Sequence, residues 1–315
     1  MANIWYIQVN RHCNNGCHFC SNPSNGNNIT YERGVELLDD FKNREYHGVI
    51  FTWWEPTLSP DLSKWIEYSK KIWLWNRMIS NGMMCSNKDF VQRLADSWLE
   101  LVHFSVYSCY EKVHDFLTDT PGSWKKLMMS ITNALNSWIR VQINTVINHY
   151  NETHLDKTIS FLNKTFPPIN HFVWNNLDPE MMRKTSTAWS TLPNFDKFKP
   201  SLNRAMCQLD SLNKTYRVEK MPLCYIRGHE WSSTETRKII KNEERIVHFL
   251  DSRELMHEVE WGHEKLPECS DCDLNTICSW VYEHEKFYNF VKVYPQKLTY
   301  DEKEKIIVQI KSIEY

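Results

Sequence analysis

Three closely spaced cysteines are the side chains in this sequence best suited to chemistry. Cys13, Cys17 and Cys20 lie together in the stretch RHCNNGCHFC. Thiolates this close in one loop can hold a single metal centre. A zinc ion completed by His12 or His18 is one possibility, because zinc takes four sulfur or nitrogen ligands. A four-iron cluster is the other, and with three protein ligands it would leave one iron open to a small molecule.

A second group of cysteines lies towards the C-terminal end. Cys269, Cys272 and Cys278 occur in ECSDCDLNTICSW, and Cys224 lies upstream in MPLCYIRGHE. These four thiolates would complete the ligand set of a second four-iron cluster. The same four thiolates would also suit a structural zinc ion.

The composition limits the classes of protein that fit. The chain has 315 residues, a formal net charge of −2 and a pI of about 6.7. The near-neutral charge disfavours a nucleic-acid partner, and no apolar run reaches the length of a membrane span. The N-terminal stretch lacks the pattern of a signal peptide. We therefore expect a cytoplasmic protein with no membrane partner, in which clustered cysteines bind metal rather than form disulfides.

The elements that position these residues follow a regular order. Short apolar runs typical of strands alternate with helical patterns of 10–15 residues, which predicts βαβ units and a parallel sheet. Strands are expected at residues 4–10, 48–52, 76–80, 101–107, 139–147 and 171–174. The sequence thus predicts an α/β fold.

The expected architecture is a partial (β/α)6 TIM-like barrel over residues 1–180, followed by a smaller cysteine-rich C-terminal region, residues 181–315. The first cysteine group follows the first strand, and the segment WWEP follows the second. Since barrel enzymes place their chemistry at the carboxyl ends of the strands, both segments should lie at one face.

Several segments resemble one enzyme family. The pattern CxxxCxΦC, with Phe19 at the aromatic position, resembles the hallmark of radical S-adenosylmethionine (radical SAM) enzymes. FTWWEPTLSPDL resembles the family's T-G-G-E-P-T-L-x-P-D-L, with Trp53 and Trp54 in place of both glycines. The segments ISNG, FSVY and VQINTVINHYN are similar to the family's third, fourth and fifth strand ends. The resemblance covers residues 4–175.

This resemblance implies a cofactor and its ligands. Cys13, Cys17 and Cys20 would hold a [4Fe–4S] cluster whose fourth iron is chelated by SAM. The residues expected to line the SAM site are Phe19, Trp53, Trp54, Glu55, Ser80, Ser105 and Asn144. An electron from a reductant such as flavodoxin or ferredoxin would cleave SAM to a 5′-deoxyadenosyl radical, which abstracts hydrogen from the substrate.

The C-terminal spacing CxxCxxxxxC carries a second resemblance, to the core of the SPASM/twitch extension of peptide-modifying radical SAM enzymes. It implies an auxiliary [4Fe–4S] cluster on Cys224, Cys269, Cys272 and Cys278. It also implies a peptide or protein side chain as the substrate, with a small molecule left open.

Tryptophan occurs where glycine is expected. The chain has 8 glycines and 14 tryptophans, whereas average usage would give roughly 20 glycines. Trp98 and Trp138 directly follow predicted helices, at the position where left-handed backbone favours glycine. Trp73 and Trp75 flank a similar turn, and Trp280 replaces the glycine of a Cys-x-Gly segment.

Three interpretations of these tryptophans compete. The chain could simply be rich in ordinary core tryptophans, which Trp65 and Trp124 fit. It could be a catalytically inactive iron–sulfur or zinc-binding module, in which genuine Trp53 and Trp54 fill the SAM pocket. Alternatively, UGA codons that the source organism reads as glycine have been translated as tryptophan. We adopt the third interpretation, because it explains composition and positions together.

Overall fold

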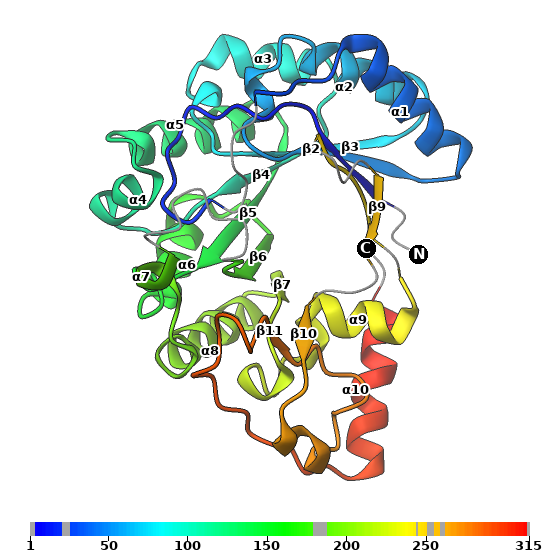
Figure 1. Ribbon diagram of the computed structural model, residues 1–315. Coiled ribbons are helices and arrows are strands. Elements are labelled where there is room, and N and C mark those ends of the chain that lie inside the picture. The colour runs from blue at the N-terminus through cyan, green and yellow to red at the C-terminus, as the bar shows by residue number, and fades with distance from the viewer. Residues whose placement is uncertain are drawn as a thin grey trace.

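Seven parallel strands follow one another in chain order around a curved sheet (Figure 1). The computed structural model describes residues 4–20, 26–178, 188–243, 245–250, 255–258 and 262–313. Within them the sheet has the order β7-β6-β5-β4-β3-β2-β1-β8-β9. Its strands are β1 Ile4–Gln8, β2 Gly48–Thr52, β3 Trp75–Ser80, β4 Leu101–Ser105, β5 Arg140–Ile147, β6 His171–Asn176, β7 Thr215–Glu219, β8 Arg245–His248 and β9 Leu255–Glu258.

The predicted partial barrel is confirmed, since the six expected strands are β1 to β6 and each pairs in parallel with the next. The sheet also takes strands from beyond residue 180. Strand β7 extends it past β6, and β8 pairs in parallel with β1. Strand β9 then runs antiparallel to β8.

Most helices cover the convex side of the sheet, while α9 and α10 lie at its β7 end (Figure 1). In chain order the helices are α1 Tyr31–Asn43, α2 Leu62–Lys71, α3 Lys88–Asp96, α4 Glu111–Thr118, α5 Ser123–Asn136, α6 Leu155–Thr165, α7 Ala188–Thr191, α8 Phe195–Ser211, α9 Thr234–Lys241 and α10 Tyr300–Ser312. A small hairpin, β10 His263–Glu264 and β11 Val281–Tyr282, lies with α9 and α10 at the β7 end of the molecule.

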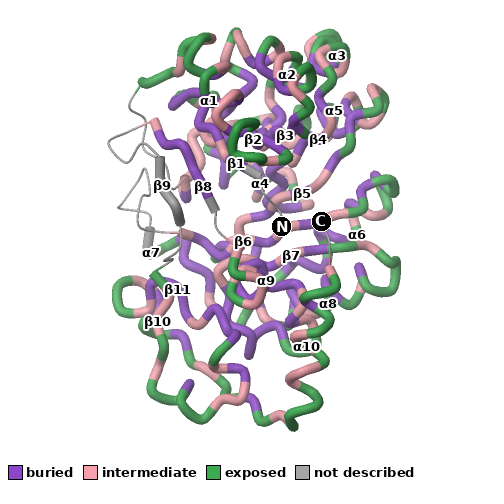
Figure 2. Tube along the Cα trace, turned by 90° about the vertical axis from the view of Figure 1, so that its right-hand side faces the viewer, coloured by how far each residue is buried: buried purple, intermediate pink, exposed green. Residues whose placement is uncertain are grey.

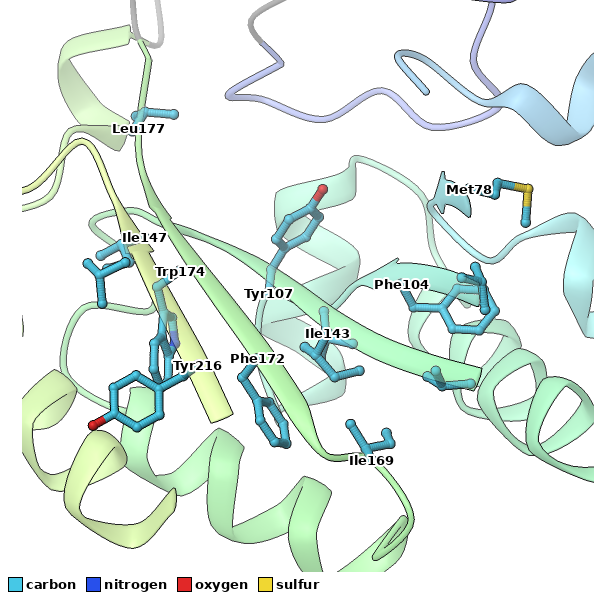
Figure 3. Packing of buried hydrophobic residues seen from close by; sticks show 14 of the residues in the cluster. Met78, Phe104, Tyr107, Ile143, Ile147, Ile169, Phe172, Trp174, Leu177 and Tyr216 are labelled. Atoms are coloured by element: carbon cyan, nitrogen blue, oxygen red, sulfur yellow. The ribbon is translucent and has the colours of Figure 1, made fainter. Parts of the chain in front are cut away.

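Alternation along the strands separates the core from the interior of the barrel. In β5 the residues Val141, Ile143, Thr145 and Ile147 are buried, whereas Gln142, Asn144 and Val146 between them are half-buried. Ile143, Phe172 and Trp174 pack in the layer between the sheet and its helices (Figure 3). Buried positions accordingly run along the strands while the outer helical surfaces are exposed (Figure 2). The intervening residues of each strand are thus left to face the barrel interior.

Three tryptophans end helices in the left-handed conformation. The φ angles of Trp73, Trp98 and Trp138 are 62°, 70° and 63°. In each case the next N–H bonds to the carbonyl five residues earlier, as Ile139 does to Ala134 at 3.0 Å. This is the Schellman arrangement, in which glycine is the usual residue. The predicted left-handed backbone at Trp98 and Trp138 is confirmed, and Trp73 has the same conformation. Trp75, by contrast, is the first residue of β3.

These indoles gain little from packing, since Trp73 is 83% and Trp138 is 95% exposed. Replacing either by glycine is expected to raise the free energy of unfolding by about 1 kcal/mol. A non-glycine residue in the left-handed region costs about 1–2 kcal/mol of stability. Glycine removes this cost, but it loses more conformational entropy on folding, which reduces the net gain. Urea unfolding would measure this.

Trp65 provides the matched control, because it is fully buried and right-handed in α2. Trp65→Ala should lose about 3–5 kcal/mol. Loss of stability in both Trp73→Gly and Trp138→Gly would contradict the assignment of these positions to glycine.

Candidate active site

The loop that follows β1, residues 11–20, carries Cys13, Cys17 and Cys20 and is held from two sides. Gly16 N–H donates to the Thr118 carbonyl at 2.8 Å, and His18 N–H donates to the Leu117 carbonyl at 3.0 Å. On the other side, the Asn10 side chain donates to the Glu55 carbonyl at 2.9 Å. The loop is therefore fixed between the end of α4 and the segment after β2.

Tyr107 is close enough to the three thiols of this loop for their charge to affect it. Burial raises the pKa of Tyr107 well above its usual range, and negative charge on Cys17, Cys20 and Cys13 would raise it further. Phe19 packs edge-on against Tyr107, with ring centroids 4.8 Å apart. Tyr107 points away from the side chains of Ile143 and Phe172 (Figure 3). The sulfurs thus gather at the carboxyl-end face of the barrel.

Two N–H groups approach the sulfur of Cys13. They come from the Asn15 backbone at 3.4 Å and from the Asn81 side chain at 3.5 Å. Such donors stabilise a thiolate and tune the potential of an iron–sulfur cluster. Three thiols on one fixed loop, with donors to sulfur, fit a [4Fe–4S] cluster with three protein ligands.

Glu55 forms the centre of a buried hydrogen-bond network. Its Oε1 accepts from the Thr57 hydroxyl at 2.6 Å and the Ser80 hydroxyl at 2.8 Å, and its Oε2 accepts from Asn81 N–H at 2.7 Å. Burial raises the pKa of Glu55, while these hydrogen bonds oppose the rise. Ser80 is itself buried, so it would act on a ligand through Glu55.

Trp53 and Trp54 follow β2 with φ angles of 59° and 57°. Two successive left-handed residues favour a pair of glycines. The Trp53 indole lines the interior cavity, with its centroid 5.9 Å from the ring of Tyr6 and 5.5 Å from that of Phe249. It therefore occupies space that glycine would leave to a ligand.

The remaining residues expected at the SAM site lie on neighbouring strands. Ser105 and Asn144 are paired across β4 and β5. The Asn144 side chain accepts a hydrogen bond from Asn175 at 2.6 Å, and Phe19 and Asn144 line the same cavity as Trp53. That cavity fills the barrel interior and has a volume of about 1180 Å³. Phe19, Trp53 and Asn144 therefore border this space, whereas Trp54, Glu55, Ser80 and Ser105 are not among its lining residues.

The four C-terminal cysteines line one small pocket. Cys224, Cys269 and Cys278 are buried, and Cys272 is half-buried. Burial raises the pKa of Cys224 to about 11 and that of Cys278 to about 12, and neighbouring thiolates contribute to both shifts. Leu274, Val293 and other apolar side chains form the rest of the wall.

Backbone N–H groups also point at these sulfurs. Cys278 receives Leu223 N–H at 3.4 Å and Trp280 N–H at 3.2 Å, and Cys272 receives Gln296 N–H at 3.3 Å. Trp280 again has a left-handed φ, of 53°. Within the described ranges, no three His, Cys, Asp or Glu side chains are placed so that they could hold a single metal ion, and this includes both cysteine groups.

Two residues of the first site were missed from the sequence. Asn81 directly follows Ser80 in ISNG, and Tyr107 ends FSVY, so both belong to segments that resemble the family's strand ends. Their contacts with Cys13 and Phe19 depend on how separate loops meet. A separate finding concerns membranes: none of the helices among the described residues is long and apolar enough to span one.

The comparison with curated proteins finds a partial relative. AdoMet-dependent heme synthase of Oleidesulfovibrio alaskensis is 26% identical over 149 residues. The match covers 46% of this chain and only 38% of that protein.

Solved structures share the fold over a longer span. SuiB of Streptococcus suis bound to S-adenosylmethionine aligns with a TM-score of 0.66 at 13% identity, covering 88% of this chain and 72% of SuiB. The complex of SuiB with the precursor peptide SuiA gives 0.56 at 13% identity, over 68% and 48% of the two chains.

A third structure, anSMEcpe with bound AdoMet and Kp18Cys peptide, gives a TM-score of 0.66 at 14% identity over 98% of this chain and 96% of that one. At such identities these likenesses show the fold alone. The family model described as Radical SAM superfamily matches residues 7–162. Because that match includes the cysteine loop and all the strand-end segments, the chain belongs to the radical SAM superfamily of enzymes.

Proposed function

We propose that this radical SAM enzyme carries a second, auxiliary [4Fe–4S] cluster and acts on a peptide or protein side chain. The observation that carries the proposal is the gathering of Cys224, Cys269, Cys272 and Cys278 around one apolar pocket. In this proposal residues 1–180 hold the SAM-binding barrel, and residues 181–315 hold the SPASM/twitch-like auxiliary site.

In the first site, Cys13, Cys17 and Cys20 would hold a [4Fe–4S] cluster with one iron open to SAM. When bound, this cluster supplies the electron that cleaves SAM to a 5′-deoxyadenosyl radical, which takes hydrogen from the substrate. Glu55, fixed by Ser80 and Asn81, would orient the amino group of SAM. Flavodoxin or ferredoxin would serve as the reductant.

Around this centre the chain positions SAM and excludes water. Phe19 of the cysteine loop packs edge-on against Tyr107, and burial raises the pKa of Tyr107, so its phenol stays neutral. Ser105 and Asn144 present polar groups at adjacent strand ends, where the sugar or carboxylate of SAM would lie. A protected site of this kind suits a radical that would otherwise react with its surroundings.

The auxiliary pocket would hold a cluster ligated only by cysteine. The N–H groups of Leu223, Trp280 and Gln296 would stabilise its thiolates. With four protein ligands it would keep no open iron, so its role would be electron transfer rather than SAM binding.

A peptide substrate is supported by the size of the cavity and by the fold. At about 1180 Å³ the cavity exceeds the usual range of about 300–1,000 Å³ for small-molecule sites. Two of the structures that share the fold contain peptides, SuiA with SuiB and Kp18Cys with anSMEcpe. We infer that SAM and a substrate side chain could occupy the interior together.

The tryptophans at positive φ decide whether a chain with this sequence can bind and cleave SAM. Among the described residues, 12 non-glycine positions have positive φ, and six of them are Trp53, Trp54, Trp73, Trp98, Trp138 and Trp280. We infer that these six are glycines in the natural protein, encoded by UGA. If Trp53 and Trp54 were instead genuine, the chain would be an inactive iron–sulfur or zinc module. The codons at 53 and 54, UGA or UGG, separate the two.

Anaerobic reconstitution of a variant with glycine at these six positions tests the function. We expect about eight irons per chain, and 5′-deoxyadenosine after reduction in the presence of SAM. Cys278→Ser should reduce the iron content to about four. Cys207→Ser, at an exposed thiol, is the control and should leave it at about eight. Bound zinc without 5′-deoxyadenosine would support the inactive module.

A further inference from the structure

A hydrogen-bonded group of four polar side chains lies outside the two cysteine sites. Its members are Cys207, Asp210, Tyr216 and His229, which we call the His229 group. Cys207 and Asp210 lie three residues apart on one face of α8, and Tyr216 lies on β7. His229 directly precedes the short 3-10 helix Glu230–Ser232. None of the four is among the residues that line the interior cavity or the C-terminal cysteine pocket.

The imidazole of His229 lies at the centre of the group. Its Nε2 lies 3.9 Å from the Cys207 sulfur, within the longer range of hydrogen bonds to sulfur. Its other ring nitrogen, Nδ1, lies 2.7 Å from the Tyr216 hydroxyl oxygen and 3.2 Å from Oδ2 of Asp210. The thiol and the carboxylate therefore contact different nitrogens of one ring. This arrangement suits proton transfer and not metal binding, because the ligands of a metal ion would converge on one point.

The hydrogen bonds of the group place the imidazole proton on Nδ1. Tyr216 has one hydroxyl proton, which it donates to Oδ1 of Asp210 at 2.8 Å. Burial raises the pKa of Tyr216, and the hydrogen bond to Asp210 raises it further, so the phenol keeps this proton. The phenol oxygen and Oδ2 of Asp210 are then both acceptors, and only a protonated Nδ1 of His229 can donate to them. In the neutral imidazole this leaves Nε2 as an acceptor, and it faces the Cys207 thiol.

Packing and backbone hydrogen bonds hold the imidazole in this orientation. Tyr216 is fully buried, and its ring centroid lies 4.8 Å from that of Trp231. The N–H of His229 donates to the Ile226 carbonyl at 2.9 Å, and the His229 carbonyl accepts from the Ser232 hydroxyl at 2.7 Å. Both the ring that directs Nδ1 and the backbone that carries the imidazole are therefore fixed.

The group contains the parts of an activated thiol. Cys207 is an exposed, free cysteine, so a reactant can reach its sulfur. A thiol reacts through its thiolate, and a neighbouring base that takes the proton makes it a better nucleophile. His229 offers that base, and Asp210 and Tyr216 fix its tautomer and stabilise the charge that it gains. An exposed cysteine alone would have none of these partners.

We propose that Cys207 is a modification site that reacts with small disulfides, with His229 as the base. The inference does not depend on the proposed function, since the His229 group borders neither cofactor site. In the reaction the thiol proton moves to Nε2 of His229, and the Cys207 sulfur attacks one sulfur of the disulfide. The disulfide bond breaks as the new sulfur–sulfur bond forms, and the leaving thiolate takes the proton from His229. Cys207 is thereby oxidised to a mixed disulfide, and the departing sulfur is reduced to a thiol.

The chemistry of the group favours a disulfide over an ester or thioester as the reactant. Acyl transfer also needs hydrogen-bond donors that stabilise an oxyanion. The side chains of the group have none to spare, because Tyr216 donates its proton to Asp210 and His229 uses its Nδ1 proton on the same two residues. Disulfide exchange needs only a thiolate and access to the sulfur that it attacks. The exposed position of Cys207 provides that access.

The test measures how fast each cysteine reacts with the neutral probe dipyridyl disulfide. Short pulses with one equivalent are applied to the reconstituted full chain with glycine at the six positions and stopped with acid. Peptide mass spectrometry then gives the labelled fraction at each cysteine. Thr132→Cys supplies the matched reference, since it adds an exposed thiol on α5, where the Thr132 hydroxyl donates to the Met128 carbonyl instead of facing an imidazole. We expect Cys207 to be labelled about tenfold or more faster than this thiol.

Substitutions in the group separate the base from mere exposure. His229→Gln should slow labelling of Cys207 about tenfold, to the rate of the reference thiol. Tyr216→Phe should slow it less, because Nδ1 can still donate to Asp210. His149→Gln is the control and should leave the rate unchanged, since that histidine pairs with Glu152 on another part of the chain.

The labelling of Cys85 reports on folding in every variant, because this cysteine is buried and should stay unlabelled. The comparison of Cys207 with the Thr132→Cys thiol changes nothing in the His229 group, so it decides the inference even where His229→Gln does not fold. Equal labelling of these two thiols would overturn the inference. An unchanged rate at Cys207 in a folded His229→Gln protein would do the same.

Discussion

Replacing Trp53 and Trp54 together by glycine is expected to turn a chain that does not bind SAM into one that binds and cleaves it. The Trp53 indole lines the cavity near Tyr6 and Phe249, so its removal opens space in the cavity next to the carboxyl end of β2. Both residues also have left-handed φ, which costs about 1–2 kcal/mol per non-glycine residue. Equilibrium binding of SAM to the reconstituted protein, followed by 5′-deoxyadenosine formation, measures the change.

Trp75 offers a matched control for this double replacement. It also lines the cavity, but it begins β3 in extended backbone and lies at the opposite end of the strands. Trp75→Gly should therefore not restore SAM binding. If the chain with both tryptophans binds SAM as tightly as the glycine form, the case for glycine at these positions loses its main support.

The second large effect is expected at the cysteine loop. In the glycine form, Cys13→Ser, Cys17→Ser or Cys20→Ser should each abolish 5′-deoxyadenosine formation. Each variant removes one of only three protein ligands of the first cluster. The iron content should then fall to about four irons per chain, those of the auxiliary cluster. Iron analysis and chromatography of the reaction products measure both effects.

Cys109 is a suitable control for these serine variants. It is half-buried, and its backbone N–H donates to the Thr158 hydroxyl at 3.2 Å, away from both cysteine groups. Cys109→Ser should retain both the iron content and the activity. A Cys17→Ser protein that still produced 5′-deoxyadenosine at the full rate would show that the cluster is held elsewhere.

Much of the barrel could be predicted from the sequence, because its signals are local. Strands β1 to β6 recur between helical patterns at regular spacing, so the parallel order follows from the chain itself. Strands β7 and β8 were not predicted, because this regular spacing ends near residue 180. Thr215–Glu219 is only five residues long, and β8 pairs with β1, which lies more than 200 residues away in the sequence. A short stretch of sequence gives no sign of pairing between strands so far apart in the chain.

The sequence by itself determined which groups can do chemistry and where the backbone must turn left-handed. Thiol spacing, the Glu-Pro segment and tryptophans after helices are features of neighbouring residues, and local conformation follows from neighbours. Only the tertiary structure decided which of these residues lie next to one another. It placed Cys224 beside Cys278 and Asn81 beside Cys13. The neighbours of a single cysteine or asparagine in the sequence do not show which residue it will meet, because packing of the whole core brings separate loops together.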